Sequence, residues 1–476
     1  MAINSGKIRG RIPPQLVHTA TKEMITIELR PYQIEAIAKI RDSLKTHKSV
    51  VFTIGCGSGK SVLAGSIAKS ATDKGNTVLF LVHRAELCEQ IADTFYNLCG
   101  VDPALCKIMM IQTARRRLKT LTAPTLIIVD EAHTFNNAYE KVFQFFPDAY
   151  KIGFTATPCR LNQGGLGNLF EDIQTGVSTR WLIDNHFLSD YRYFSFPIVD
   201  TSGLHTRAGE FVQEEVNALM ENKAVYSGAV EQYLKLTPGK KAMVYCSSIK
   251  ASKEVVKEFI DNGISAAHVD GTTPKAERER IVEAYRKGEI AVVSNVDLFG
   301  VGFDDKDIEV TVLLRPTQSL ALAVQQNMRC MRYKEGKTAI ILDCCGNAAR
   351  HGLPDDEREW SLETRKKQET IVKIRECENC YAVYPPTMQK CPYCGHVATK
   401  EIQRKDKKQV TVDLVEIKRQ DDIRNKKYSE LDAKTWADVE EIRKARGYKP
   451  AWAIRFADLH GIPVPHKYDY MRRFMK

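Results

Sequence analysis

Short runs of apolar residues alternate with longer, helix-like stretches through the first 346 residues. The runs have apolar residues at consecutive positions rather than only at every second one, which is typical of strands buried on both faces of a parallel sheet. The runs form two groups of five: Val50–Ile54, Val78–Val82, Ile108–Ile111, Leu126–Val129 and Ile152–Phe154, then Ala242–Tyr245, Ala266–Val269, Ile290–Val293, Val310–Leu314 and Ala339–Leu342. This spacing predicts an α/β chain with two consecutive lobes, each a parallel sheet flanked by helices.

The periodicity weakens between and after the two groups, and these changes set the expected boundaries. The first half divides into an N-terminal tail, a first lobe and a connecting segment, expected over 1–24, 25–190 and 191–223. The second half divides into a second lobe, a linker, a cysteine-rich ribbon and a basic, mainly helical region, expected over 224–346, 347–375, 376–397 and 398–476.

Positive charge is concentrated near the end of the chain. The formal net charge of the 476 residues is +11, and residues 361–476, with 26 basic and 17 acidic residues, carry +9 of it. A basic region suits a polyanion such as nucleic acid, and a solvated basic surface is the alternative. There is no apolar run of membrane-spanning length and no secretory signal, so we expect a cytoplasmic protein without a membrane partner.

A glycine-rich turn lies between the first predicted strand and a helical pattern over Val62–Ser70. Backbone N–H groups in such a turn can approach phosphate oxygens, and the helix that follows adds the positive end of its dipole. Lys60 would reach the β- and γ-phosphates of ATP, and the Ser61 hydroxyl would ligate Mg²⁺. Because Ile54 stands where the strict pattern has glycine, a purely structural turn is the alternative. The nucleotide contacts expected from the turn are Gly57, Ser58, Gly59, Lys60 and Ser61.

Two carboxylates, Asp130 and Glu131, follow the apolar run Leu126–Val129. Burying adjacent carboxylates is costly without a charge partner. Mg²⁺ held by Asp130, beside a water activated by Glu131, would supply one. An acidic first helical turn is the alternative for an isolated pair, but the phosphate-binding turn upstream favours the metal site.

These elements and their order resemble the superfamily 2 helicases and translocases. The resemblance covers about residues 25–346 and implies two tandem RecA-like lobes. Within the superfamily the chain is most similar to RadD-type bacterial and phage-encoded DEAD/DEAH-box DNA helicases. The matching motifs are Leu29–Gln33, the glycine-rich turn, Val82–Leu87, Ile111–Thr113, Asp130–His133, Phe154–Pro158, Val244–Ser247, Val269–Gly271, Asn295–Asp304 and Gln325–Arg332.

The resemblance implies roles for residues that the spacing alone does not assign. Arg329 and Arg332 would be arginine fingers that stabilise charge on the transferring phosphoryl group. Met328 stands where the family usually has glycine before the first of these arginines. The further nucleotide contacts that the resemblance implies are Tyr32, Gln33, Gly302 and Asp304. The implied catalytic residues are Lys60, Asp130, Glu131, Arg329 and Arg332.

Four of the 13 cysteines are paired by their spacing. Cys377 with Cys380, and Cys391 with Cys394, form two C-x-x-C knuckles. Four thiolates at this spacing can surround one Zn²⁺ tetrahedrally. An iron site with the same ligands and a redox dithiol are the alternatives. We expect a zinc ribbon that is separate from the lobes, so that its loss impairs DNA binding more than folding.

The chemistry expected of the chain is therefore ATP-dependent work on nucleic acid. We predict a DNA helicase or translocase that uses ATP, Mg²⁺ and Zn²⁺ and acts on single-stranded, branched or duplex DNA. An RNA helicase is the first alternative, because the motor motifs do not distinguish the two nucleic acids. A non-catalytic nucleic-acid-binding scaffold with a degenerate motor is the second.

Overall fold

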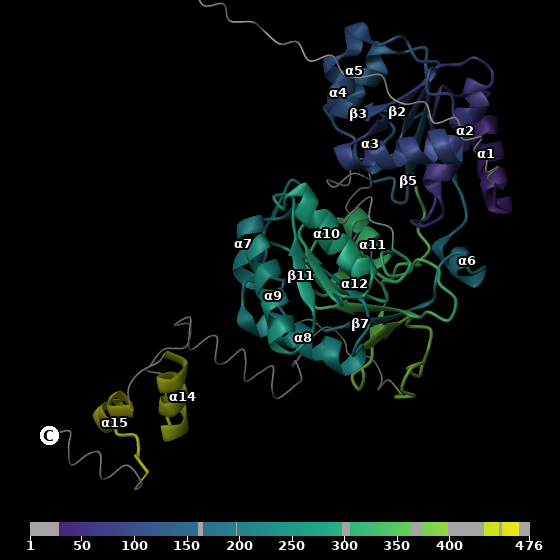
Figure 1. Cartoon of the computed structure of the whole chain (residues 1–476). Helices are drawn as coiled ribbons and strands as arrows, with labels where there is room; N and C mark the ends of the chain where they lie inside the picture. The colour runs from purple at the N-terminus through teal and green to yellow at the C-terminus, as the bar shows by residue number, and fades with distance from the viewer. Residues whose placement is uncertain are drawn as a thin grey trace, which may run out of the picture.

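Two α/β lobes contain most of the structure, the first drawn above the second in Figure 1. The structure is a computed structural model, and the residues it describes are 28–159, 165–196, 198–297, 305–363, 374–397, 433–446 and 450–465. The expected N-terminal tail, 1–24, and the basic run Arg404–Lys408 lie outside these residues.

The first lobe is built on a six-stranded sheet in the order β3-β2-β4-β5-β1-β6, with every pair parallel. The five predicted strands are present, and the short strand β6 adds one more. The strands are β1 (Ser49–Thr53), β2 (Val78–Val82), β3 (Cys106–Met110), β4 (Leu126–Val129), β5 (Tyr150–Thr155) and β6 (Asp172–Thr175). The α-helices are α1 (Pro31–Ser43), α2 (Lys60–Thr72), α3 (Ala85–Ala92), α4 (Ile111–Arg116), α5 (Asn137–Phe145) and α6 (Thr179–Asp184). Three short helices of other types are η1 (Asp93–Leu98), η2 (Leu118–Thr120) and η3 (Ala132–Thr134).

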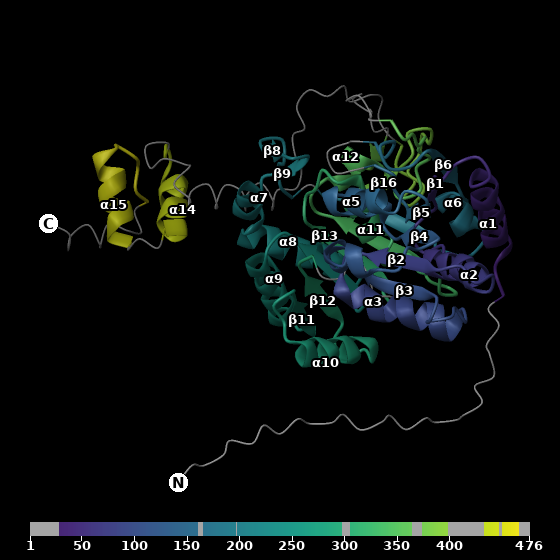
Figure 2. The same cartoon turned by 90° about the horizontal axis from the view of Figure 1, so that it is seen from above.

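Apolar residues on both faces of this sheet are buried, which explains the unbroken apolar runs. Successive side chains along a strand point to opposite faces. In β1, Val50 and Phe52 pack into the core on the side of α1 and α2, whereas Val51 packs into the core on the side of α4 and α5. The helices therefore cover both faces of the sheet, as Figure 2 shows from above.

The second lobe has an eight-stranded sheet in the order β11-β12-β10-β13-β14-β7-β16-β15. The pairs from β11 to β7 are parallel, and the last two pairs are antiparallel. The strands are β7 (Tyr191–Ser195), β10 (Ala242–Cys246), β11 (Ala266–Val269), β12 (Val292–Asn295), β13 (Val310–Leu314), β14 (Ala339–Asp343), β15 (Arg375–Glu376) and β16 (Ala382–Tyr384), with a separate hairpin of β8 (Thr206–Arg207) and β9 (Glu210–Phe211). The helices are α7 (Gln213–Met220), α8 (Lys223–Leu236), α9 (Ile249–Asp261), α10 (Lys275–Arg286), α11 (Leu320–Asn327) and α12 (Asn347–His351).

The expected connecting segment, 191–223, proves to be part of the second lobe. Its first five residues form β7, which pairs with β14 in register Ile341↔Tyr193. Tyr193 is fully buried and Phe194 is 7% exposed. Sequence periodicity missed this strand because its aromatic residues are interrupted by Arg192 and Ser195, so it has no continuous apolar run.

The cysteine ribbon also belongs to the second sheet, and our expectation that it is separate from the lobes is wrong. Strand β16 pairs antiparallel with β7, and the N–H of Ser195 donates to the carbonyl of Tyr381 at 3.0 Å. Cys377 and Cys391 are each 2% exposed and lie in the same apolar core as β10, β13 and α8. The ribbon completes the lobe because it covers the edge of β7.

The expected linker, 347–375, returns to the first lobe after α12. The N–H of Gly167 donates to the carbonyl of Leu362 at 2.9 Å, and a Cβ atom at Gly165 would overlap the same carbonyl. Asp355 accepts hydrogen bonds from Tyr191 and, at 3.1 Å, from Arg180 of α6. This segment therefore crosses from one lobe to the other.

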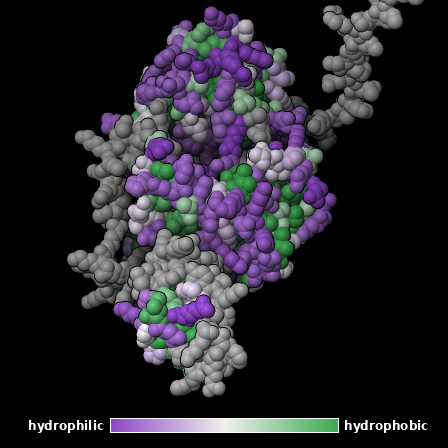
Figure 3. Space-filling model, turned by 90° about the vertical axis from the view of Figure 1, so that its left-hand side faces the viewer, coloured by the Kyte–Doolittle hydropathy of each residue, from purple (hydrophilic) through white to green (hydrophobic). Residues whose placement is uncertain are grey.

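Helices α14 (Trp436–Arg446) and α15 (Pro450–Leu459) are the described part of the predicted basic helical region. They pack around a small core of their own, which includes Val439, Ile442 and Phe456. Among the described residues, no helix is both long and apolar enough to cross a membrane. The face drawn in Figure 3 is mostly hydrophilic, with apolar residues in small separate groups.

Candidate active site

The glycine-rich turn has the backbone that a phosphate-binding loop needs. Gly57 and Gly59 have φ values of +84° and +79°, a region that side chains with a Cβ disfavour. Helix α2 begins directly afterwards at Lys60. A Cβ atom at Gly59 would lie 2.8 Å from the Gln33 amide nitrogen. Both glycines are therefore required, by conformation and by the close approach of neighbouring side chains.

Tyr32 is hydrogen-bonded to the backbone of this loop. Its hydroxyl donates to the carbonyl of Ser58 at 2.7 Å, and its ring packs edge-on against Trp181 and Phe187. Tyr32 and Ser58 are buried and do not line the cavities described below. Tyr32 therefore holds the loop in place, and the nucleotide contacts expected of Tyr32 and Ser58 stay predictions.

A cavity of about 300 Å³ opens beside the loop, between the two lobes. Side chains of both lobes line it, and the polar ones among them are Lys60, Ser61, Gln90, Thr94, Asp130, Glu131, Gln325, Arg329 and Arg332. A second cavity of about 260 Å³ adjoins it and is lined by Glu28, Arg30, Gln33, Gly57, Gly59 and Val62. The structure thus brings together the predicted loop, the carboxylates and both arginines. Gly302 and Asp304 lie outside the described residues.

Lys60 and Glu131 face one another at the floor of the cavity. Their charged atoms, Nζ and Oε1, are 3.7 Å apart, and both side chains are about nine-tenths buried. Burial alone would lower the pKa of Lys60, but the carboxylates of Glu131 and Asp130 outweigh it and raise the pKa. Burial would raise the pKa of Glu131, but the charge of Lys60 lowers it. The site therefore holds an ammonium and a carboxylate at neutral pH.

Asp130 has a different environment from Glu131. Burial and the adjacent Glu131 charge raise the pKa of Asp130 to about 7. The Asp130 carboxylate lines the same cavity as Glu131 and could ligate a divalent cation there. The Ser61 hydroxyl lines the same cavity. Oxygen ligands of this kind fit Mg²⁺, which usually takes one or two from the protein and the rest from phosphates and water.

His133 connects the carboxylates to the next motif. Its Nδ1 lies 3.3 Å from Glu131 Oε2 and 3.0 Å from the Thr155 hydroxyl. That hydroxyl also bonds the Thr157 backbone, donating to its carbonyl and accepting from its N–H at 3.1 Å. Glu131 itself has a left-handed backbone conformation, with a φ of +50°, and directly precedes the short helix η3. His133 thus lies in contact with Glu131 and is hydrogen-bonded to Thr155, whose hydroxyl in turn holds the Thr157 backbone.

The two predicted arginine fingers follow α11 of the second lobe and line the cavity opposite Lys60. Arg329 is 7% exposed and donates a hydrogen bond to Tyr245. Arg332 lies against the loop, because a Cβ atom at Gly57 would clash with its guanidinium. Met328 has helical φ and ψ of −69° and −6°, so a residue other than glycine is unstrained there.

Sequence reasoning missed several residues of this site. Gln325 donates to Glu131 from the second lobe, Thr155 bonds His133, and Tyr245 accepts from Arg329. Gln325 lies inside the motif that carries the fingers, which is the one signal that could have identified it. Thr155 and Tyr245 lie at or near the ends of the buried strands β5 and β10, inside the motifs Phe154–Pro158 and Val244–Ser247, but those motifs do not say which of their residues contacts the site.

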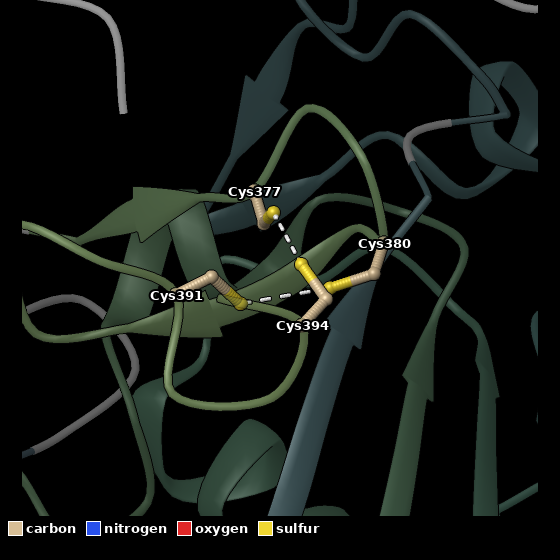
Figure 4. Close-up of side chains that lie close together, drawn as sticks. All are labelled: Cys377, Cys380, Cys391 and Cys394. Atoms are coloured by element: carbon tan, nitrogen blue, oxygen red, sulfur yellow. Dashed lines mark hydrogen bonds between the residues drawn. The ribbon is translucent and has the colours of Figure 1, made fainter. Parts of the chain in front are cut away.

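The four cysteines of the ribbon converge on one point (Figure 4). Their sulfur atoms all lie within 4.8 Å of one another, and Cys377–Cys394 and Cys380–Cys391 are each separated by 3.6 Å. Tetrahedral Zn–S bonds of about 2.3 Å place sulfurs ~3.8 Å apart, so the arrangement fits Zn²⁺. The backbone N–H of His396, with the Asn379 side chain, lowers the pKa of Cys394 to about 6, which favours a thiolate ligand.

Comparison with known proteins agrees with this geometry. Residues 26–160 match the family "Type III restriction enzyme, res subunit", and residues 227–334 match "Helicase conserved C-terminal domain". A 51.5 kDa protein of a Lactococcus phage is 40% identical over 367 residues, which cover 76% of this chain and 81% of the phage protein. The putative ATP-dependent helicase IRC3 of Saccharomyces cerevisiae is 27% identical, covering 67% of this chain and 51% of its own length.

Two further comparisons extend the series. The DNA 3'-5' translocase XPB2 of Sulfurisphaera tokodaii is 22% identical, covering 70% of this chain and 85% of its own. Among solved structures, a fragment of a putative HsdR subunit of a type I restriction enzyme from Vibrio vulnificus superposes with a TM-score of 0.56 at 22% identity, covering 68% of this chain and 66% of that one. This likeness shows a shared fold.

The fold is that of two RecA-like lobes with a glycine-rich loop at their interface. The chain belongs to the superfamily 2 helicases. It spans about half the length of the yeast relative. The finer resemblance to RadD-type proteins stays a prediction.

Proposed function

We propose that the chain is an ATP-dependent DNA translocase or helicase. The observation that carries the proposal is the single cavity in which Lys60 and Glu131 of the first lobe meet Arg329 and Arg332 of the second. A site assembled from two lobes is complete only when they are together, so hydrolysis and lobe movement are coupled. We propose as well that the ribbon holds a structural Zn²⁺.

In the proposed mechanism the loop and its lysine bind the phosphates. Backbone N–H groups of the turn and the Lys60 ammonium contact the phosphate oxygens, while Gln33 and Arg30, in the adjoining cavity, contact the base. Ser61 and Asp130 would hold Mg²⁺, which shields the phosphate charge when bound. Glu131, ionised at neutral pH, orients the attacking water and accepts its proton.

The arginines act on the phosphoryl group from the opposite lobe. As the bond to the leaving phosphate breaks, negative charge spreads over the phosphoryl and leaving-group oxygens. The guanidiniums of Arg329 and Arg332 stabilise that charge. Release of the cleaved phosphate removes their shared ligand, and the lobes separate. Nucleic acid that contacts both lobes would be moved by this cycle of closing and opening.

DNA is the favoured nucleic acid, because the archaeal relative that covers 70% of this chain is named as a DNA translocase. RNA remains the alternative. The deciding experiment compares ATP hydrolysis by the purified chain with single-stranded DNA, duplex DNA, forked DNA and RNA. We expect stimulation by at least one DNA and a weaker effect of RNA of equal length. Stimulation by RNA alone would make the chain an RNA helicase, and no hydrolysis with any of them would make it a scaffold.

Replacing either arginine should lower the rate of ATP hydrolysis far more than the affinity for ATP. Because a finger acts mainly on transition-state charge, Arg329→Ala and Arg332→Ala should each lower kcat at least about tenfold, with the Kd for ATP changed less than about threefold. Arg41→Ala is the control, since Arg41 lies on α1, does not line the cavity and donates to the Ser70 hydroxyl at 3.0 Å. An equal loss of binding and turnover would show that the arginines hold the cleft together instead.

A further inference from the structure

The chain passes from the first lobe to the second through Leu188 and Ser189. The N–H of Leu188 donates to the carbonyl of Leu182 in α6, at 3.1 Å, which anchors it on the first lobe. Ser189 is bonded to the second lobe instead. Both residues are buried, at 1% and 3% exposure. No motif includes either of them.

Ser189 makes three hydrogen bonds to the backbone that carries the second arginine finger. Its N–H donates to the carbonyl of Met331 at 2.9 Å, and its hydroxyl donates to the carbonyl of Arg332 at 3.1 Å. The same hydroxyl accepts from the N–H of Lys334 at 3.3 Å. Leu188 and Arg332 are paired as an antiparallel bridge. The turn after α11 is therefore fixed to the point where the chain changes lobes.

Leu188 also contacts the phosphate-binding loop. A Cβ atom at Gly57 would lie 2.8 Å from Leu188 Cδ2 and would clash with the Arg332 guanidinium. The loop, the lobe crossing and the finger thus meet at one glycine. Ser189 itself does not line the cavity, so any influence that it has on ATP must act through Arg332.

We propose that Ser189 is the positioning residue of the second arginine finger. Its hydroxyl ties the Arg332 carbonyl to the Lys334 N–H, which fixes the backbone turn and aims the guanidinium at the loop. Small misplacement of a charge-stabilising group costs much of its effect, because such groups work only when pre-organised. The inference rests on the proposed function, since it concerns the rate of ATP hydrolysis.

The test compares Ser189→Ala with Ser195→Ala. Ser195 is a buried serine of the adjoining strand β7, and among the described residues its hydroxyl has no hydrogen-bond partner. The two variants lose the same atom in similar surroundings. We expect Ser189→Ala to lower kcat about tenfold with KM for ATP changed less than twofold, and Ser195→Ala to change neither.

A double-mutant cycle with Arg332→Ala separates positioning from general destabilisation. If Ser189 acts through the finger, adding Ser189→Ala to Arg332→Ala should change kcat less than twofold. A further tenfold loss in the double variant would overturn the inference, as would equal turnover of Ser189→Ala and Ser195→Ala. A wild-type chain that hydrolyses no ATP would overturn the proposed function as well, so the two failures are distinguishable.

Discussion

Glu131→Gln is expected to bind ATP and to hydrolyse it at least ~10²-fold more slowly than the wild type, as the loss of a general base implies. Glutamine keeps the size of the side chain and one oxygen that accepts hydrogen bonds, but it has no negative charge and accepts no proton. The carboxylate is suited to the task because the charge of Lys60, 3.7 Å away, offsets the burial that would otherwise keep it protonated. Single-turnover hydrolysis and nucleotide binding, measured separately, check both parts.

Glu35→Gln provides the matched control for this experiment. Glu35 lies on α1 of the same lobe, 62% exposed, in an ion pair with Lys39. That variant should hydrolyse ATP at the wild-type rate. Near-normal turnover of Glu131→Gln would contradict the mechanism, and the water would then have to be oriented by another group. Loss of ATP binding in Glu131→Gln would instead show that the Lys60–Glu131 pair is needed to shape the loop.

The strands that the sequence shows most directly are those buried on both faces. In β1, β2 and β4 every position is buried, and the sequence shows this as consecutive apolar residues. Strand β6, Asp172–Thr175, has no fully buried position because it lies at the sheet edge, and its polar residues gave no signal. Strands β15 and β16 were missed because their pairing depends on β7, which comes about 180 residues earlier in the chain.

The residues of the candidate site also divide into those that the sequence shows and those that only the folded structure shows. Lys60, Asp130 and Glu131 carry chemistry that restricts residue type and spacing, so they are visible in the sequence. Ser189 only needs to present a hydroxyl and an N–H at one place, and many sequences satisfy that requirement. Its role depends on a contact with residues over 140 positions away, which only the folded chain creates.

The ribbon's place in the second sheet changes what zinc removal should do. The sequence predicts a module after both lobes whose loss leaves the motor folded. The structure shows instead that Cys377 and Cys391 lie in the second lobe's core and that β16 covers β7. Aromatic contacts add to this packing, with Phe196 and Tyr381 ring centres 5.1 Å apart. Zinc loss should therefore destabilise the lobe itself.

Cys377→Ser combined with Cys380→Ser should remove zinc and lower the melting temperature of the second lobe by about 10 °C. Structural zinc contributes ~10–16 kcal/mol in isolated peptides, but here much of the core remains, and a loss of about 3–4 kcal/mol corresponds to such a shift in a lobe of this size. Because the edge of β7 is uncovered, its amides should also exchange faster with solvent. Metal content, calorimetry and hydrogen exchange measure the three effects.

The control replaces two cysteines that lie away from the ribbon, Cys88→Ser with Cys99→Ser, both half-buried in the first lobe. It should keep one zinc per chain and the wild-type protection of β7. If the ribbon variant lost zinc but kept its melting temperature and the protection of β7, the pairing of β16 with β7 would not depend on the metal. The zinc would then organise only the two knuckles, and the backbone pairing of β16 with β7 and the apolar contacts of Ala382 and Tyr384 would hold the edge of the sheet without it.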